Sequence, residues 1–128
     1  MALRIVRLGT PRAKLEGIRI GTVRRPPRGV PKAEFAAHDW YDVWFPTLAP
    51  SVGTMKLGLD ARTPAQWAAF TRKFRAEMRA PASAHALNLV AALSHTANLS
   101  IGCYCADEAR CHRSLLREML ADRGARIT

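Results

Sequence analysis

Alternating apolar and polar positions predict three strands. From Ala2 to Leu8, apolar residues alternate with basic ones, which is the period of two expected for a half-buried strand. Residues Gly17 to Val23 repeat this pattern, and Leu99 to Cys105 form a third, more apolar stretch. The last residues, 125–128, are expected to add a short strand. Together these segments predict a small sheet.

Apolar residues spaced three and four apart predict three helices. The first begins after Thr63, because threonine suits the N-cap and Pro64 suits the first helical position. Its apolar face consists of Trp67, Phe70, Phe74 and Met78. A second helix is predicted from about Ser83 to Thr96, and a third from Ser114 to Arg123. The second helix is expected to bury Leu89, Val90 and Leu93.

Proline-containing segments separate the early strands from the helices. Residues 24–32 hold three prolines and are expected to be irregular, and a short helix is expected at 31–38. The aromatic, proline-punctuated segment 39–51 is typical of an ordered loop. Strands mixed with helices, without a repeat or a linker, predict an α/β fold. We expect a single α/β domain over residues 1–128, with helices flanking a small, mostly parallel sheet.

The charge of the chain is strongly positive and is concentrated near its start. The formal net charge is +10, and residues 1–32 contain nine basic side chains against one acid, Glu16. A field of this kind attracts anionic small molecules and nucleic acids. A merely solvated surface is the alternative, because arginine outnumbers lysine in an alanine-rich chain, as a biased genomic base composition would produce.

The apolar segments of the chain are short. None approaches the roughly 20 residues that a membrane-spanning helix needs. The first ten residues lack the apolar core of a signal peptide. We therefore expect a cytoplasmic protein without membrane association, whose three cysteines are reduced thiols.

All three cysteines lie in one segment, where a predicted strand leads into a predicted helix. Cys103 and Cys105 end the strand, and Cys111 is followed directly by His112 and Arg113. Because ligands of open α/β sheets bind where strands end and helices begin, this corner is the leading candidate site. If the site is catalytic, Cys111 is the candidate nucleophile, His112 the acid or base and Arg113 the charge stabiliser.

Other interpretations of this segment stay open. Cys103, Cys105, Cys111 and His112 are four zinc-ligand types, although an extended Cys-x-Cys would point its thiols apart, so no metal ligand is assigned and a structural zinc site is kept as an alternative. The segment from Cys105 to Arg110 has the spacing of an anion-cradling nucleophile loop but contains two acids and no glycine, which argues against it. Cys103 is expected to be mainly a core residue.

The motifs of the chain resemble those of the family known as domain of unknown function 488, a group of bacterial and archaeal α/β proteins. The resemblance rests on Cys105-Ala106-Asp107 followed by Cys111-His112-Arg113, on Arg24 and Arg28-Gly29, and on Trp40, Pro50 and Ser51. Asp107 stands where the family usually has glutamate, and Val23 where it often has aspartate. The resemblance implies a Rossmann-like domain and a site, but no reaction.

We therefore expect one polar pocket at the carboxyl end of the sheet, as either an enzyme site or a binding site. Catalytic candidates are Cys111, His112 and Arg113, and ligand-binding candidates are Arg24, Arg28, Trp40, Ser51, Cys105 and Asp107. The expected partner is an anionic small molecule, a nucleotide or another phosphorylated compound. A nucleic-acid-binding module that uses the basic N-terminal face is the alternative. No cofactor is predicted, and the oligomeric state is left open.

Overall fold

The computed structural model describes residues 1–128 and contains one small, entirely parallel sheet. Its four strands are β1 (Leu3–Arg7), β2 (Ile18–Gly21), β3 (Val43–Trp44) and β4 (Leu99–Cys103). They lie in the order β1-β4-β2-β3, so the last strand of the chain is central. Leu99 pairs with Leu3 on one side and with Ile18 on the other. The predicted α/β fold with a small parallel sheet is confirmed.

Four α-helices and three short 3-10 helices complete the fold. The α-helices are α1 (Val52–Asp60), α2 (Pro64–Glu77), α3 (Pro81–Leu93) and α4 (His112–Asp122). The 3-10 helices are η1 (Lys32–Glu34), η2 (Pro46–Leu48) and η3 (Glu108–Arg110). The predicted start of α2 is confirmed, because the Thr63 side chain accepts a hydrogen bond from the Gln66 N–H in a complete capping box. Helix α1 was not predicted.

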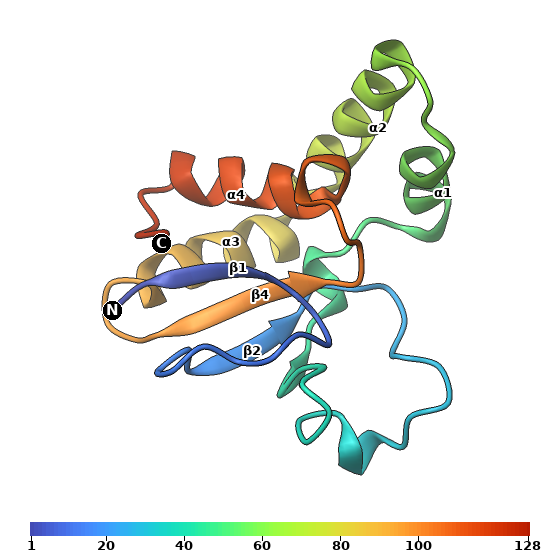
Figure 1. Ribbon diagram of the computed structural model, residues 1–128. Helices are drawn as coiled ribbons and strands as arrows, with labels where there is room; N and C mark the ends of the chain where they lie inside the picture. Colours follow the sequence, from blue (N-terminus) through green and yellow to red (C-terminus); the bar gives the residue numbers. More distant parts are fainter.

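The main hydrophobic core lies between one face of the sheet and helices α2, α3 and α4. Leu3, Leu99 and Ile101 of the sheet share this core with Phe74 and Leu116, which are fully buried. Figure 1 shows α3 and α4 along the same side of the sheet, with α1 and α2 beyond the carboxyl end of β4. These helices cover only one face of the sheet. The opposite face is covered by other segments of the chain.

Two positions of α3 differ from the prediction. Leu89 and Leu93 are exposed, at 59% and 37%, although Val90 is buried as expected. The buried face of α3 consists instead of Ser83, Ala86, Leu87, Val90 and Ala91. Small alanines fill this face because α3 packs closely on α4. The prediction for Leu89 and Leu93 was wrong because it took a face of the helix displaced from the buried one, on which Leu87 lies.

The opposite face of the sheet carries a buried ion pair. Arg19 on β2 and Ser100 on β4 are fully buried, and both bond to Glu16 from the segment between β1 and β2. The Arg19 guanidinium also donates to the carbonyl oxygens of Thr10 and Asp39, at 2.8 Å each. One buried arginine therefore joins the sheet to two loops.

The two ends of the molecule differ in character. The chain termini meet at one end, where Ile127 forms an isolated bridge with Leu3 (Figure 1). Segments that follow β1, β2 and β4 gather at the other end, which is the end expected to hold a site. No helix of the structure is long and apolar enough to cross a membrane.

Candidate functional site

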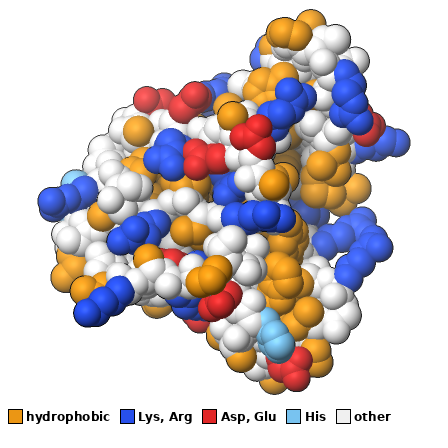
Figure 2. All heavy atoms as spheres, in the orientation of Figure 1, with side chains coloured by type: hydrophobic (Ala, Val, Ile, Leu, Met, Phe, Trp, Pro, Cys, Tyr) orange, Lys and Arg blue, Asp and Glu red, His pale blue; other side chains and the backbone are white.

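A pocket of about 740 Å³ opens at the carboxyl ends of β1, β4 and β2. It is lined by residues at or just after the ends of these strands, by Met55 and Leu59 of α1, by residues 24–28 of the proline-containing loop and by Trp40. Figure 2 shows hydrophobic atoms in this hollow, between the helices above and the loop below, with Lys and Arg side chains at its rims. The volume is that of a small-molecule site.

Four arginines and no acidic residue line the pocket. Arg25 and Arg28 are exposed on the loop, and their guanidinium groups make no hydrogen bond or ion pair. Arg7, the last residue of β1, donates from Nε to the Tyr104 carbonyl at 3.2 Å, which leaves its terminal nitrogens available. Arg24 donates to the carbonyls of Pro46, Ala49 and Pro50. The pocket is therefore positively charged, and Arg24 also holds the loop in place.

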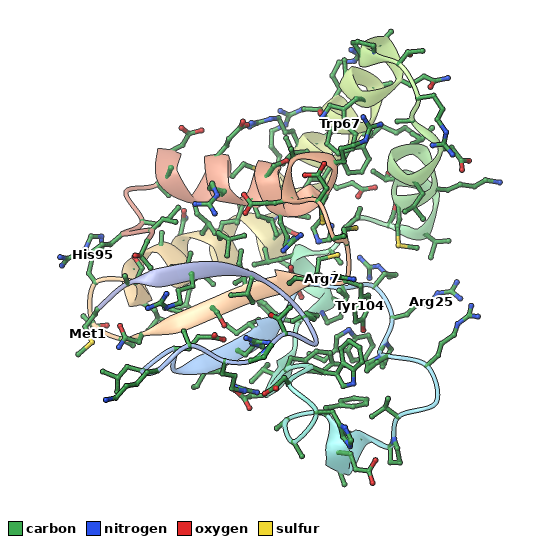
Figure 3. The ribbon with its side chains drawn as sticks, in the orientation of Figure 1. Met1, Arg7, Arg25, Trp67, His95 and Tyr104 are labelled. Atoms are coloured by element: carbon green, nitrogen blue, oxygen red, sulfur yellow. The ribbon has the colours of Figure 1, made fainter.

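Aromatic residues shape the wall of the pocket next to β4. The rings of Trp40 and Tyr104 meet edge to face, with their centroids 5.9 Å apart. The Tyr104 hydroxyl donates to the carbonyl of Arg25 at 2.8 Å, which ties the arginine-bearing loop to the end of β4. Figure 3 shows Arg7 and Tyr104 close together and Arg25 reaching outward from the loop. Burial raises the pKa of Tyr104, so its hydroxyl remains a neutral donor.

The three cysteines and His112 form one cluster at the floor of the pocket. The Cys103 and Cys105 sulfurs are 3.9 Å apart, and the Cys111 sulfur lies 3.8 Å from His112 Nδ1. The ligand atoms of Cys103, Cys111 and His112 all lie within 4.8 Å of one another. Strand β4 ends at Cys103 and the chain bends at Tyr104. The predicted extended Cys-x-Cys is therefore wrong, because the bend brings the thiols together.

The thiols in this cluster differ in acidity. Hydrogen bonding with the Cys103 and Cys111 thiols, together with the charge of Arg113, lowers the pKa of Cys105 against the effect of burial. The hydrogen bond with Cys103 also lowers the pKa of Cys111, whereas interactions with Cys105 and Cys111 raise that of Cys103. Cys105 and Cys111 therefore lose their protons first, and Cys103 acts as a donor to them.

Only part of the predicted catalytic set faces the pocket. His112 and Cys105 line it together with Cys103, whereas Cys111 and Arg113 are buried at 2% and 3% exposure and do not. Arg113 donates from Nη2 to the Cys105 carbonyl at 2.6 Å, and its Nε has no hydrogen-bond partner. The structure therefore brings these residues to one corner but places Arg113 behind the thiols.

Of the remaining predicted ligand residues, two line the pocket and two lie outside it. Trp40 and Arg28 line the pocket. Asp107 is exposed and caps η3 by accepting a hydrogen bond from the Ala109 N–H. Ser51 caps α1 and donates to Glu77, at 2.6 Å, outside the pocket. Asp107 and Ser51, which belong to the motifs that resemble the family, therefore act as N-caps of helices in this structure. His38, His85 and His95 are exposed.

Sequence reasoning missed several pocket residues. Arg7 is the last residue of β1 and Tyr104 directly follows β4, so their places at the carboxyl ends of two predicted strands were a usable signal. Met55 and Leu59 come from the unpredicted helix α1, for which the chain offered no pattern. The pocket is accordingly more apolar than expected, with charge at its rim.

The residues that could hold a metal ion are those of the thiol cluster. Cys103, Cys111 and His112 present one ligand atom each within 4.8 Å, and the Cys105 sulfur is adjacent to that of Cys103. The Nε2 atom of His112 lies 2.7 Å from the carbonyl of Thr22. A carbonyl only accepts hydrogen bonds, so Nε2 carries a proton, and in the neutral ring Nδ1 presents its lone pair to the cluster.

Fold and site together define an α/β protein with a thiol- and arginine-lined crevice at the carboxyl end of a parallel sheet. The chain belongs to the DUF488-N3a family, described as the active DUF488-N3 subclade, which it matches over residues 3–124. This match confirms the resemblance seen in its motifs. No curated protein and no solved structure matches the chain.

Proposed function

We propose that the protein binds an anionic small molecule with a flat or apolar body, such as a nucleotide, in the pocket at the end of the sheet. The observation that carries the proposal is the lining: four arginines, no acid, two aromatic rings and several apolar side chains in about 740 Å³. Phosphate groups pair well with guanidinium groups, and aromatic walls suit a base or a similar ring.

The unpaired arginines indicate how a ligand would be oriented in the pocket. Arg25 and Arg28 are unpaired at the rim, so the charged end of a ligand is expected there. Trp40 and Tyr104 lie deeper, beside β4, and would contact the ring. Two other arginines of the N-terminal basic segment are neutralised internally, because Arg19 pairs with Glu16 and Arg12 with Asp42. Four of the remaining basic residues of this segment, Arg7, Arg24, Arg25 and Arg28, line the pocket.

The test compares matched ligands by calorimetry. Nucleoside 5′-monophosphates are titrated beside their parent nucleosides and inorganic phosphate. The expected result is that the monophosphate binds more tightly than either part alone. The double variant Arg25→Gln/Arg28→Gln is expected to weaken monophosphate binding about tenfold and to leave nucleoside binding unchanged.

A second double variant controls for net charge. Arg72→Gln/Lys73→Gln removes the same charge from the exposed side of α2, away from the pocket. It should leave monophosphate binding within about twofold of the parent chain. Equal effects of the two double variants, or binding of oligonucleotides without binding of any mononucleotide, would contradict the pocket proposal and favour a nucleic-acid-binding surface.

A further inference from the structure

Beneath the pocket floor, we propose a tetrahedral zinc site with Cys103, Cys105, Cys111 and His112 Nδ1 as its ligands. The donors come from the end of β4, the bend after it and the start of α4. Cys103, Cys105 and His112 also line the anion pocket, but the zinc site does not depend on a ligand bound there.

Two pairs of donor atoms have nearly the spacing of a tetrahedral site, and Cys103, Cys111 and His112 present theirs within 4.8 Å of one another. Zinc bonds of about 2.3 Å to sulfur and about 2.0 Å to nitrogen place two sulfurs about 3.8 Å apart, and sulfur and nitrogen about 3.5 Å apart. The structure has 3.9 Å between the Cys103 and Cys105 sulfurs and 3.8 Å between the Cys111 sulfur and His112 Nδ1. Shifts of a few tenths of an ångström would complete the coordination of these pairs.

The histidine is already oriented as a ligand. Its Nε2–H donates to the Thr22 carbonyl, at 2.7 Å, and the residue is 7% exposed. Metal-binding histidines almost always donate their second ring nitrogen in this way, which fixes the tautomer and the ring plane. The Nδ1 lone pair is left facing the sulfur of Cys111.

The buried arginine is an independent observation that points to an anionic centre. Arg113 is 3% exposed, has no carboxylate within salt-bridge distance and leaves Nε without a partner. A buried cation without a counter-charge is costly. Each cysteine binds zinc as a thiolate and releases its proton to solvent, so three thiolates and one Zn²⁺ carry a net charge of −1. That charge balances Arg113, which already bonds to the Cys105 carbonyl.

The donor set also selects the ion and its role. Three thiolates and an imidazole are soft ligands that favour Zn²⁺ over hard cations such as Mg²⁺ or Ca²⁺. Four protein ligands leave no open position, which is typical of structural rather than catalytic zinc. The ion would fasten the end of β4 to the start of α4 and so hold the floor of the pocket.

The primary test uses the full chain produced without a histidine tag, in zinc-containing medium and under reducing conditions. Elemental analysis is expected to find about one zinc ion per chain, and chelation should lower the melting temperature by more than about 5 °C. Cobalt substitution should give the intense near-ultraviolet bands of thiolate-to-cobalt charge transfer. Substoichiometric zinc that refilling does not raise, or cobalt binding without those bands, would overturn the site.

Variants identify the ligands. Cys111→Ser and His112→Gln should lose zinc, whereas His85→Gln, on the exposed side of α3, should keep it. Cys105→Ser should weaken zinc binding and reduce the cobalt bands; unchanged bands would refute Cys105 as the fourth ligand. If a variant fails to fold, zinc content and cobalt spectra of the parent chain still decide. Zinc without nucleotide binding would leave this site standing and remove only the proposed function.

Discussion

Replacing Glu16 with glutamine removes the carboxylate that balances the fully buried guanidinium of Arg19. Two hydrogen bonds of 2.7 and 3.0 Å join the pair. The side chain of Arg19 is 0% exposed and that of Glu16 is 2% exposed. Solvent therefore screens neither charge. Removing one partner of such a pair costs about 3–5 kcal/mol, because the remaining charge stays buried. For a chain of this size, the melting temperature should fall by roughly 10–20 °C.

The assay is thermal and urea unfolding followed by circular dichroism at neutral pH. The control is Glu118→Gln, which breaks a surface pair with Arg75 in which Glu118 is 60% exposed. That change is expected to cost less than about 1 kcal/mol. If Glu16→Gln were no more destabilising than Glu118→Gln, the reasoning that one buried pair anchors this face of the sheet would be refuted.

The same pair predicts how stability depends on pH. Burial raises the pKa of Glu16, but hydrogen bonds from Arg19, Ser100 and the Ala13 N–H outweigh it and lower the pKa from 4.5 to about 2. The folded state thus binds this proton more weakly than the unfolded state. The resulting stabilisation, about 3 kcal/mol, is present above pH 4.5 and is lost as the pH falls toward 2. In Glu16→Gln this part of the acid dependence should be missing.

Two further predictions concern backbone and loop. Gly17→Ala should destabilise the fold by more than about 3 kcal/mol, because a Cβ would lie 1.8 Å from the Asn98 carbonyl oxygen. Gly29→Ala shares a positive φ but meets nothing within 4 Å, and should cost only about 1 kcal/mol; equal losses in urea unfolding would contradict the steric argument. Tyr104→Phe should speed proteolysis of the loop at Arg25, with a stability change near 1 kcal/mol, and an unchanged cleavage rate would show that this hydrogen bond does not hold the loop.

The elements that could be predicted are those whose local pattern agrees with their burial. Helix α2 has a capping box and one apolar stripe, and β4 is a short apolar run that is buried throughout. Helix α1 begins with an N-cap at Ser51 but has no capping box, and Gly53 and Gly58 interrupt it. A Cβ at Gly58 would lie 2.9 Å from the ring of Phe70, so this glycine permits close packing of α1 on α2. The requirement for glycine at position 58 thus comes from Phe70 in α2, and the residues around Gly58 do not indicate it.

The candidate site could be located from the sequence more readily than its contacts. The segment with all three cysteines was identified because it follows a strand and opens a helix. The bend at Tyr104 that gathers the thiols, and the three carbonyls that hold Arg24, depend on tertiary structure. Charge was harder still: Arg19 counts as part of a basic surface in the sequence, yet it lies at 0% exposure against Glu16.

The central place of β4 determines the order in which the molecule can assemble. Strand β1 pairs along its length only with β4, although 96 residues separate Leu3 from Leu99. During synthesis β1 must therefore wait, unpaired, until most of the chain has left the ribosome, because contacts so distant in sequence form late and slowly. The pocket, which lies where β1, β4 and β2 end, cannot exist on a nascent chain that stops short of β4. The pocket is therefore complete only when β4 has taken its place between β1 and β2.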